Sequence, residues 1–573
     1  MNLAPTRTVA VGPGVGIFDT NGFDSTLSQG VSGIGVFAKD GEGTLTLLGS
    51  QTNTGGTAVA GGTLRTGAAN ILNSPGGVRV GPAGTLDLAG FNQTVAQAIN
   101  GGLIRTGGTG STDLTVTGPY IGQGGTLALN TVLAGDASPS DRLVLSGAGA
   151  SASGSSFLDI TNIGGLGAMT VGPGILVVDA VGGATTTPGA FALAGPVVAG
   201  PYEYMLFRGD GNPDAWYLRS TLNCALDPTS PICAVSPGPG PSPVVPIYRQ
   251  ETSLYAALPA MTLLYGRVLL DTLHERMGED TGPAGYGAPH GTWGRVIGQH
   301  GDRDGSNAGI YGSGPKYDYD FWAFQAGTDL YRSANSAGAR DRAGAFFAIG
   351  NGSGDVTHVT DVKAGENTFM AYSWGGYWTH YTAEGAYLDG VLMGTFYDAD
   401  AKSTRIPKLT TEGTGFGASL EGGYPFRFAG GFIIEPQAQI VYQTLNLHNS
   451  SDVGALVHFD DVNSLAGRLG IRFVQEWGMT DLLSNEPGIF TAWVRPNFWY
   501  EFLGDPKTSF SSETGFIPFE ADLFGPTFEI NTGFTAAVTS NTAVYANASY
   551  LVGIGGSADG NAYDGKLGLR IAW

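Results

Sequence analysis

The residue types that most often carry catalysis are present in this chain, but their spacing does not suit it. The seven histidines include His274, His290, His300 and His358, and none stands in an HExxH pair that would bind zinc from one helix face. No GxSxG turn is present, and residues 1–247 contain no histidine to act as the base of a serine nucleophile. The sequence therefore predicts no catalytic residues, no metal ligands and no cofactor, and indicates a protein that is not an enzyme.

Two other patterns suggest chemistry and have simpler interpretations. The glycines of residues 12–16 lack the lysine and the following helix of a phosphate-binding loop, so they are interpreted as corner residues. The adjacent carboxylates Asp460 and Asp461 could form an acid–base pair, but solvation of an exposed loop is the favoured interpretation. Both patterns indicate structure rather than catalysis.

Cys224 and Cys233 are the only cysteines of the chain, and they lie close together in the sequence. Turn-forming Asp-Pro and Ser-Pro pairs stand between them, which favours a small disulfide loop made in an oxidising compartment. Two unrelated thiols are the alternative. A metal site is less favoured, because no histidine lies nearby to complete a ligand set.

Composition narrows the class of protein. At 573 residues the chain is too long for one compact core, so at least two domains are expected. Its 94 glycines are well above the ordinary share, which indicates tight turns and stacked short strands. The formal net charge is -21 and no run is rich in lysine and arginine, so nucleic acid is not an expected partner.

The last strand of the chain alternates strictly and ends on an aromatic residue. Leu567, Leu569, Ile571 and Trp573 fall on one face, and small or basic residues fall on the other. A strand that stays apolar on one face up to a terminal tryptophan indicates a barrel wall that faces lipid. No run of about 18 apolar residues predicts a transmembrane helix, but barrel strands leave little trace in such a search.

The same period of two covers most of residues 291–573. Glu435 and Gln437 would line the inside of a strand whose other face carries Ile440 and Tyr442. About twelve such segments lie in this half, an even number, as a closed bacterial barrel requires. A soluble β-sandwich would show the same alternation, but aromatic residues near the ends of the apolar faces favour a membrane girdle.

Residues 30–130 have the pattern of short strands separated by glycine. A Gly-Thr-Leu-x-Leu theme recurs at 43–47, 84–88 and 125–129. Recurrence about every twenty residues, with glycine or asparagine at each corner, predicts a parallel β-helix whose rungs stack on one another. A β-sandwich is the alternative, although a sandwich does not need internal repetition.

These repeats and the segment after them resemble the passengers of monomeric autotransporters, which use type V secretion. Residues 43–64 are similar to the passenger strand repeat. The motifs that match the C-terminal passenger region are Asp141–Leu145, Gly189–Leu193, Ala199–Tyr204 and Trp216–Ser220. The resemblance implies a right-handed β-helix that residues 131–222 cap and help to fold.

A proline-rich linker and a helix follow the passenger-like half. Residues 237–243 alternate proline with small residues and cannot form a helix or a central strand. A helix is predicted to begin near Tyr248 and to stop at Gly278, with Pro259 acceptable only in a first turn or at a break. The apolar residues at near-helical spacing are Leu263, Leu264, Val268, Leu269 and Leu273. In autotransporters the corresponding helix passes through the barrel lumen.

The strand-rich half also resembles the autotransporter translocator barrel. The matching motifs stand in the usual order at 293–296, 325–330, 387–390, 418–424, 435–437 and 467–470. The resemblance implies a monomer in the outer membrane of a Gram-negative bacterium, with its passenger on the cell surface and without a cofactor. The implied partners are outer-membrane lipid, periplasmic chaperones and the barrel assembly machinery. That machinery would recognise Leu567, Leu569, Ile571 and Trp573 as an assembly signal.

The predicted fold is all-β apart from the lumen helix. The predicted parts are a β-helical passenger at 1–130, a cap at 131–222, a cysteine loop and linker at 223–247, a lumen-threading α-helix at 248–283, and a twelve-stranded antiparallel transmembrane barrel at 284–573. The first residues carry no secretion signal, so an N-terminal portion is expected to be missing.

The predicted function is to anchor and help export the chain's own passenger, with the passenger adhesive or structural. One alternative is a β-helical enzyme whose active site lies in a missing N-terminal part, and another is a porin fused to a surface module. Residues 248–290 contain no asparagine, so self-cleavage by an asparagine side chain is not expected and the passenger should stay attached. Asp271 or Asp280 are the candidates for acid-assisted cleavage.

Overall fold

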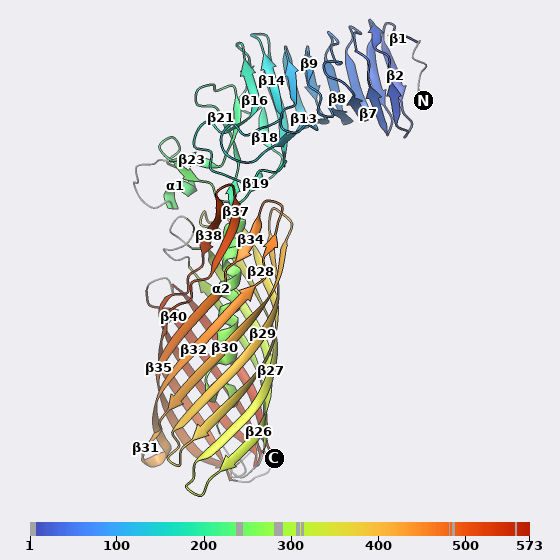
Figure 1. The fold of residues 1–573 in the computed structure, drawn as a ribbon. Coiled ribbons are helices and arrows are strands. Elements are labelled where there is room, and N and C mark those ends of the chain that lie inside the picture. Colours follow the sequence, from blue (N-terminus) through green and yellow to red (C-terminus); the bar gives the residue numbers. More distant parts are fainter. Residues whose placement is uncertain are drawn as a thin grey trace.

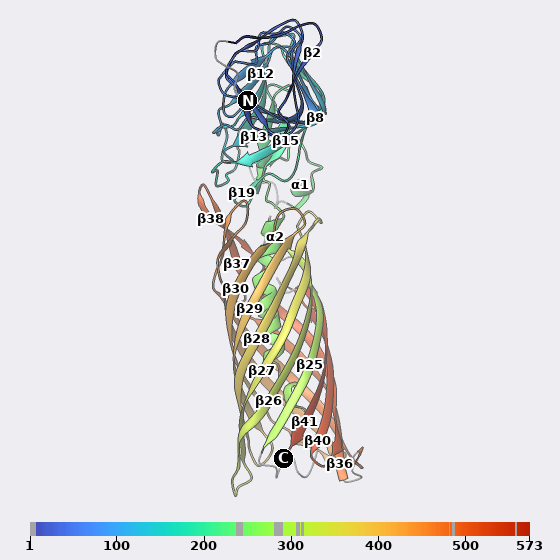
Figure 2. The same ribbon diagram turned by 90° about the vertical axis from the view of Figure 1, so that its right-hand side faces the viewer.

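The computed structural model describes residues 7–235, 244–279, 290–304, 310, 314–480, 482–483, 487–555 and 559–573. A β-helix made by the first part of the chain stands over one end of a β-barrel made by the last part (Figure 1). The rungs stack along a line that crosses the barrel axis, so the first strands lie to one side of the barrel (Figure 1 and Figure 2). One helix, α2 (Glu251–Leu270), lies inside the barrel in both views.

The β-helix is built from strands that pair in parallel with the strand of the next rung. Thr44 pairs with Thr63, and Thr63 pairs with Thr85, so the Gly-Thr-Leu repeats stack in register. Leu45 and Leu64, which follow these threonines, are fully buried in the core. The predicted parallel β-helix is therefore confirmed. The strands of this part are β1 (Val9–Val11), β2 (Val15–Asp19), β3 (Ser25–Leu27), β4 (Val31–Gly33), β5 (Val36–Asp40), β6 (Thr44–Leu47), β7 (Thr57–Thr66), β8 (Val78–Asp87), β9 (Gln93–Val95), β10 (Ala98–Asn100), β11 (Leu103–Arg105), β12 (Asp113–Val116), β13 (Pro119–Thr131), β14 (Arg142–Ser146), β15 (Ser151–Asn162), β16 (Ile175–Val181), β17 (Thr185–Thr186), β18 (Phe191–Leu193), β19 (Val198–Ala199), β20 (Tyr202–Glu203), β21 (Met205–Arg208), β22 (Trp216–Arg219) and β23 (Thr221–Asn223).

The parallel stack ends at β16, whose next neighbour runs in the opposite direction. β22 pairs with β16, and β21 pairs with β22, both antiparallel. Trp216 of β22 packs edge-on against Phe191 of β18, with ring centroids 5.5 Å apart, and Phe191 packs against Tyr120 of β13. These aromatic rings close the end of the β-helix core that is nearer the barrel.

Twelve long antiparallel strands form the closed barrel. β25 pairs with β41 from Gly291 opposite Ala572 to Arg303 opposite Gly560, which closes the ring. The predicted twelve-stranded barrel is confirmed, and β41 is its closing strand. In ring order the strands are β25 (Gly291–Arg303), β26 (Lys316–Ala334), β27 (Arg340–Thr357), β28 (Lys363–Tyr381), β29 (Tyr387–Ser403), β30 (Leu409–Gly423), β32 (Phe432–Leu447), β35 (Val462–Thr480), β36 (Pro487–Glu501), β39 (Gly525–Thr539), β40 (Thr542–Gly553) and β41 (Gly560–Ala572), and the hairpin from β30 to β32 also contains β31 (Phe426–Arg427) and the 3-10 turn η2 (Ala429–Gly431).

A second, smaller sheet stands on the rim of the barrel on the passenger side (Figure 1). It is antiparallel and consists of β33 (Ser450–Ser451), β34 (Leu456–Phe459), β37 (Lys507–Ser512) and β38 (Gly515–Glu520). These strands lie in the two loops that join β32 to β35 and β36 to β39. We call them the rim sheet.

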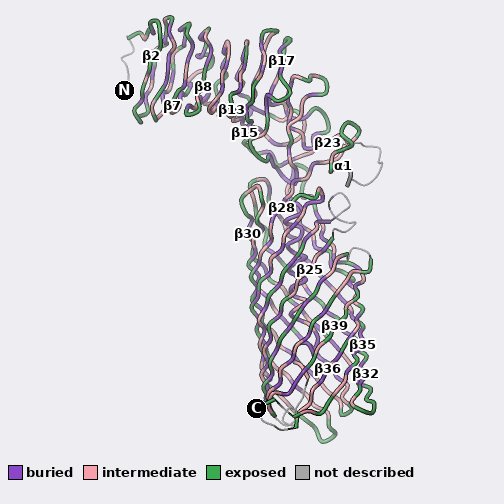
Figure 3. The backbone as a smooth tube through the Cα atoms, turned by 180° about the vertical axis from the view of Figure 1, so that it is seen from behind, coloured by how far each residue is buried: buried purple, intermediate pink, exposed green. Residues whose placement is uncertain are grey.

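Buried and exposed residues alternate along the barrel strands (Figure 3). Glu435 and Gln437 are 5% and 4% exposed, whereas Ile440 and Tyr442 on the opposite face are 48% and 37% exposed. This part of β32 thus has a polar inner face and an apolar outer face, as predicted, whereas inward residues beside α2, such as Phe321 and Phe369, are apolar. This arrangement is the one that a barrel wall needs when its outside meets hydrocarbon.

α2 lies on one side of the lumen, against strands β26 to β30 and β32. It begins at Glu251 rather than near Tyr248 and ends at Leu270. The prediction of one helix continuing to Gly278 is wrong, because Asp271 has a left-handed backbone (φ +43°) and Leu273 starts a separate short helix, α3 (Leu273–Met277). By length and composition α2 could cross a membrane, but in the structure its side chains are mostly buried in the lumen.

Pro259 lies in the interior of α2 without breaking it. A proline has no N–H and cannot donate to the carbonyl four residues earlier, which here belongs to Tyr255. Thr508 of the rim sheet donates its hydroxyl to that carbonyl over 3.3 Å. The expectation that Pro259 marks a first turn or a break is therefore wrong, because a side chain from another element supplies the missing hydrogen bond.

Candidate functional site

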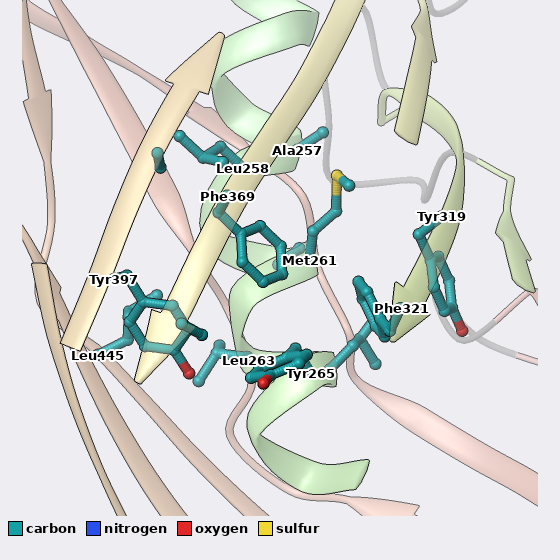
Figure 4. Close-up of a cluster of buried hydrophobic side chains, with 14 of the residues drawn as sticks. Ala257, Leu258, Met261, Leu263, Tyr265, Tyr319, Phe321, Phe369, Tyr397 and Leu445 are labelled. Carbon is teal, nitrogen blue, oxygen red and sulfur yellow. The ribbon is translucent and has the colours of Figure 1, made fainter. Parts of the chain in front are cut away.

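Aromatic packing fixes the middle of α2 in the lumen. The ring of Tyr265 lies edge-on to Phe321, Phe369 and Tyr397, with centroid distances of 5.7, 5.4 and 6.4 Å (Figure 4). Of the predicted lumen-helix residues, Leu263, Leu264 and Leu269 of α2 and Leu273 of α3 are buried, and Val268 is half-buried. Apolar contacts therefore hold α2 in the lumen along its length.

Where α2 ends, polar side chains of the barrel wall form hydrogen bonds with its last carbonyl groups. Arg295 Nη2 and Gln325 Nε2 donate to the carbonyl of Leu269 over 3.2 and 3.3 Å. Gln439 Nε2 donates to the carbonyl of Asp271 over 2.8 Å. The last carbonyl groups of a helix have no partner within it, so these donors stabilise the helix end inside the lumen.

Charged residues after the break pair with charges on the barrel wall. Arg276 Nη2 donates to both carboxylate oxygens of Asp389, each over 2.9 Å. The carboxylate of Asp271 lies 2.6 Å from Arg295 Nη1 and 2.8 Å from Lys566 Nζ. Breaking a buried ion pair leaves an uncompensated charge, so these pairs fix the position of the chain along the barrel axis.

Two further residues of this segment are held in the same way. Glu275 lies 3.1 Å from Arg495 Nη2. The ring of His274 lies between two carboxylates, with Nδ1 2.8 Å from Glu279 and Nε2 3.1 Å from Glu435. The lower lumen is thus a network of paired charges around α3.

This arrangement is suited to holding the chain and gives no support to cleavage by Asp271. Its carboxylate is shared by two cations of the wall. Asp280, the other candidate, lies outside the described residues. Within the described parts of the chain, no group of three or more His, Cys, Asp or Glu side chains could hold a metal ion.

Arg249 closes the passenger-side end of the lumen. Its guanidinium donates to both carboxylate oxygens of Asp452, over 2.8 and 3.2 Å, and lies over the ring of Phe510 at 5.0 Å. The hydroxyl of Tyr255 donates to the same carboxylate over 2.9 Å. The side chains of Arg249 and Asp452 are 0% and 1% exposed, so this pair locks the start of α2 to the rim.

His358 contributes to the same closure from the turn between β27 and β28, outside the membrane-spanning strands. Its Nδ1 lies 2.7 Å from Ser253 Oγ of α2. Burial, together with the nearby charge of Arg405, lowers the pKa of His358 to about 4. The ring is therefore neutral at neutral pH.

The two cysteines form a disulfide in the structure. The loop that they close contains the start of α1 (Pro231–Val235) and follows β23, which pairs with β24 (Val244–Pro246). The proline-rich stretch at 237–243 lies outside the described residues.

The proposed assembly-signal residues stand on the outer face of the closing strand. Leu567, Leu569, Ile571 and Trp573 are 58%, 43%, 38% and 54% exposed. The backbone N–H and carbonyl of Trp573 both bond to His290, each over 3.1 Å. The four side chains are placed to meet lipid, and their recognition during assembly stays a prediction.

The charged anchors of the lumen are not among the residues predicted from the sequence. Arg295, Arg495 and Lys566 stand at inward positions of strands whose outward residues are largely apolar. A charge inside a membrane-spanning structure needs a partner, so inward cations could have been paired with the acids of residues 271–279. The pairing of Arg249 with Asp452 could not have been predicted in this way, because Asp452 lies in a loop and not at an inward position of a strand.

Comparison with protein families gives two matches. The Autotransporter beta-domain matches residues 292–549, and Autochaperone Domain Type 1 matches residues 97–206. The second match begins and ends earlier than the predicted cap at 131–222. Together they cover the barrel from β25 into β40 and the part of the β-helix nearest to it.

Individual relatives give the same picture. The Adhesin BmaC autotransporter of Brucella suis is 30% identical over 95% of this chain, and the Autotransporter adhesin AIDA-I of Escherichia coli is 27% identical over 80%. The chain spans 16% and 34% of the length of these two relatives. Among solved structures, the transport unit of the autotransporter AIDA-I from Escherichia coli is 21% identical, with a TM-score of 0.45, and covers 57% of this chain and 100% of that one.

Proposed function

The chain belongs to the autotransporters of the bacterial outer membrane, and on that premise we propose that its barrel anchors and helps export its own β-helical passenger. The proposal rests mainly on the path of the chain through the barrel. α2 enters the lumen beside the β-helix, and the first barrel strand, β25, begins at the opposite end, next to Trp573. A barrel that closes around a chain leading to an external domain fits a route of export.

The fold itself can supply the free energy for this process. In lipid, a closed barrel satisfies every strand hydrogen bond, because it has no edge. Outside, each rung of the β-helix that folds buries apolar residues against the previous rung. Both steps are favourable without a nucleotide or a cofactor, so export can be driven by folding.

The passenger is proposed to be adhesive or structural. The two relatives above are named as adhesins, and the strands of this chain up to β16 form a continuous β-helix. We also propose that periplasmic chaperones and the barrel assembly machinery handle the chain as a monomer. Assembly would use the outer face of β41.

Export is tested by expressing the full chain, with a secretion signal, in a Gram-negative host beside a variant that lacks residues 291–573. Proteinase K added to intact cells should reach the passenger only when the barrel is present. The full chain should also migrate faster on a gel when it is not heated, because a closed barrel resists unfolding. A passenger accessible without the barrel, or a soluble chain with no heat-dependent migration, would refute the proposal.

Attachment and adhesion need separate tests. The passenger should remain on the cells, and a separate passenger band in the medium would contradict attachment. Cells that display the chain should bind to host cells or to one another more than cells that display a barrel lacking residues 7–223. Equal binding would contradict the adhesive role and leave the export proposal untouched.

A further inference from the structure

The only lysine of residues 1–247, Lys39, is buried in the β-helix. It stands near the end of β5, where its backbone pairs with Phe18 of β2 on one side and Val59 of β7 on the other. These strands belong to the part of the β-helix that lies far from the barrel (Figure 1). The residue is 0% exposed, and because burial of an unpaired charge costs much free energy, its surroundings must supply partners for a cation.

Three backbone carbonyl groups from two successive rungs surround the ammonium group of Lys39. Nζ donates to the carbonyl oxygens of Asp40 and Gly41, over 2.9 and 2.6 Å. It also donates to the carbonyl oxygen of Gly61 in the next rung, over 3.0 Å. An ammonium group has three N–H donors, so each donor has one acceptor here. A neutral amine would turn its lone pair toward one of these oxygens, so the geometry fits the charged form.

Two carboxylates lie near this group. Asp19 and Asp40 stand opposite each other at the ends of β2 and β5. Burial lowers the pKa of Lys39 from its ordinary 10.5, and the negative charges of Asp40 and Asp19 oppose that shift. Lys39 therefore brings a positive charge to a turn that carries two negative ones.

The backbone at Gly62 leaves room for the ammonium group. Its φ of +61° is left-handed, and a Cβ built there would lie 2.8 Å from Nζ of Lys39 and closer still to the carbonyl oxygen of Gly41. Glycine at this position lets β7 approach the turn that follows β5 and enclose the ammonium group from the side of the next rung.

We propose that this turn is a cation-binding site made of backbone carbonyl groups, and that Lys39 fills the site from within the chain. The site accepts a small monovalent cation, because neutral carbonyl oxygens can replace the hydration shell of such an ion. A chain that supplies its own cation holds the two rungs together whatever ions the medium contains. This inference goes beyond the proposed function, because it concerns how the displayed passenger stays folded and not how it is exported.

The test is hydrogen–deuterium exchange of the full chain in detergent micelles, with the variants Lys39→Ala and Lys39→Met. The first variant opens the space that the amine leaves, and the second fills much of that space with an apolar side chain. In both, the carbonyl groups lose their donor. The N–H groups of Thr20, Gly22 and Thr63 bond to carbonyl oxygens of residues 40–43. They should therefore exchange about tenfold faster or more.

Added cations distinguish a binding site from simple loss of a side chain. Ammonium chloride should restore slow exchange in Lys39→Ala, whereas the same concentration of tetramethylammonium chloride should not, because that ion is larger and has no N–H to donate. Wild type and Lys39→Met should respond to neither salt. The matched control is Arg79→Met, which removes an exposed positive charge from β8 and should leave exchange at the turn unchanged.

Two results with the variants would overturn the proposal. Exchange at the wild-type rate in both Lys39→Ala and Lys39→Met would show that the ammonium group contributes nothing to the turn. Ammonium that slows exchange in Lys39→Ala no more than tetramethylammonium does would show that the carbonyl groups select no small cation.

The unmodified chain gives a check that does not depend on how the variants fold. A water-soluble acylating reagent should modify the exposed amines of Lys363, Lys402 and Lys408 in the native chain, and should reach Lys39 only after denaturation. Acylation of Lys39 in the native chain at the rate of the three exposed lysines would refute the enclosed site.

Discussion

Asp141→Asn should destabilise the part of the passenger nearest the barrel. Asp141 immediately precedes β14 and is fully buried. Its carboxylate accepts five hydrogen bonds, from the N–H groups of Gly108, Gly110, Thr112 and Asn130 and from the hydroxyl of Thr106, over 2.6 to 3.3 Å. One charged side chain therefore organises the loop between β11 and β12 and the end of β13.

The size of the effect follows from which bonds an amide can keep. An asparagine oxygen can accept from Gly110 and Thr112 as before, but its NH2 group would face the N–H groups of Gly108 and Asn130. The hydroxyl of Thr106 can turn to accept. Two bonds to a buried charge are then lost, and at about 1.5–3 kcal/mol each the free energy of unfolding should fall by about 3–6 kcal/mol.

The assay is urea unfolding of the full chain in detergent micelles, followed by tryptophan fluorescence. Trp216 is the only tryptophan of residues 1–247, and the part of the signal that disappears in a Trp216→Phe background reports the passenger. Asp159→Asn is the control, because this β15 carboxylate is exposed and should change stability by no more than about 0.5 kcal/mol. A loss below about 1 kcal/mol for Asp141→Asn, or the same loss in the control, would refute the reasoning.

Three further predictions concern the barrel. The pKa of His358 in the folded protein is about 4, below its ordinary 6.5, so the neutral ring contributes stability above pH 6.5. That stability is lost as the pH falls toward 4, and thermal unfolding in micelles should show the loss. The variant His358→Gln should not show this pH dependence. Deletion of Trp573 should reduce the amount of heat-modifiable barrel in outer-membrane fractions, and unchanged insertion would speak against an assembly signal. Arg276→Met should lower barrel stability by about 3–5 kcal/mol, because Asp389 is left buried without its cation. Adding Asp389→Leu should recover much of that loss in the same thermal assay, and no recovery would show that the pair is not its source.

The barrel and the β-helix could be predicted because each imposes a period on the sequence. Lipid on one side of a strand requires an apolar residue at every second position, as at Leu567 and Leu569. Stacked rungs require the same residue types at the same position of each rung, as at Thr44, Thr63 and Thr85. Both signals are local and repeat many times, so single exceptions do not hide them.

The ends and breaks of α2 could not be predicted, because residues far away in the sequence determine them. Gly278 ends the short helix α3, as the sequence predicts, but Arg295 and Gln325 bind the carbonyl of Leu269, and α2 ends earlier. At Pro259 the sequence predicts a first turn or a break, but the helix continues, because Thr508 donates to the carbonyl that the proline leaves without a partner. These partners are known only once the barrel has closed around the helix.

The orientation of the β-helix determines what the protein presents to its surroundings. Contacts at Gly200 and Glu203 hold the β-helix across the barrel axis, so each rung extends the passenger parallel to the membrane plane. One side of the β-helix then faces the outer membrane, and the opposite side faces the medium. Extra rungs would enlarge the area of cell surface that the passenger covers, and would add little to the distance between the passenger and the membrane.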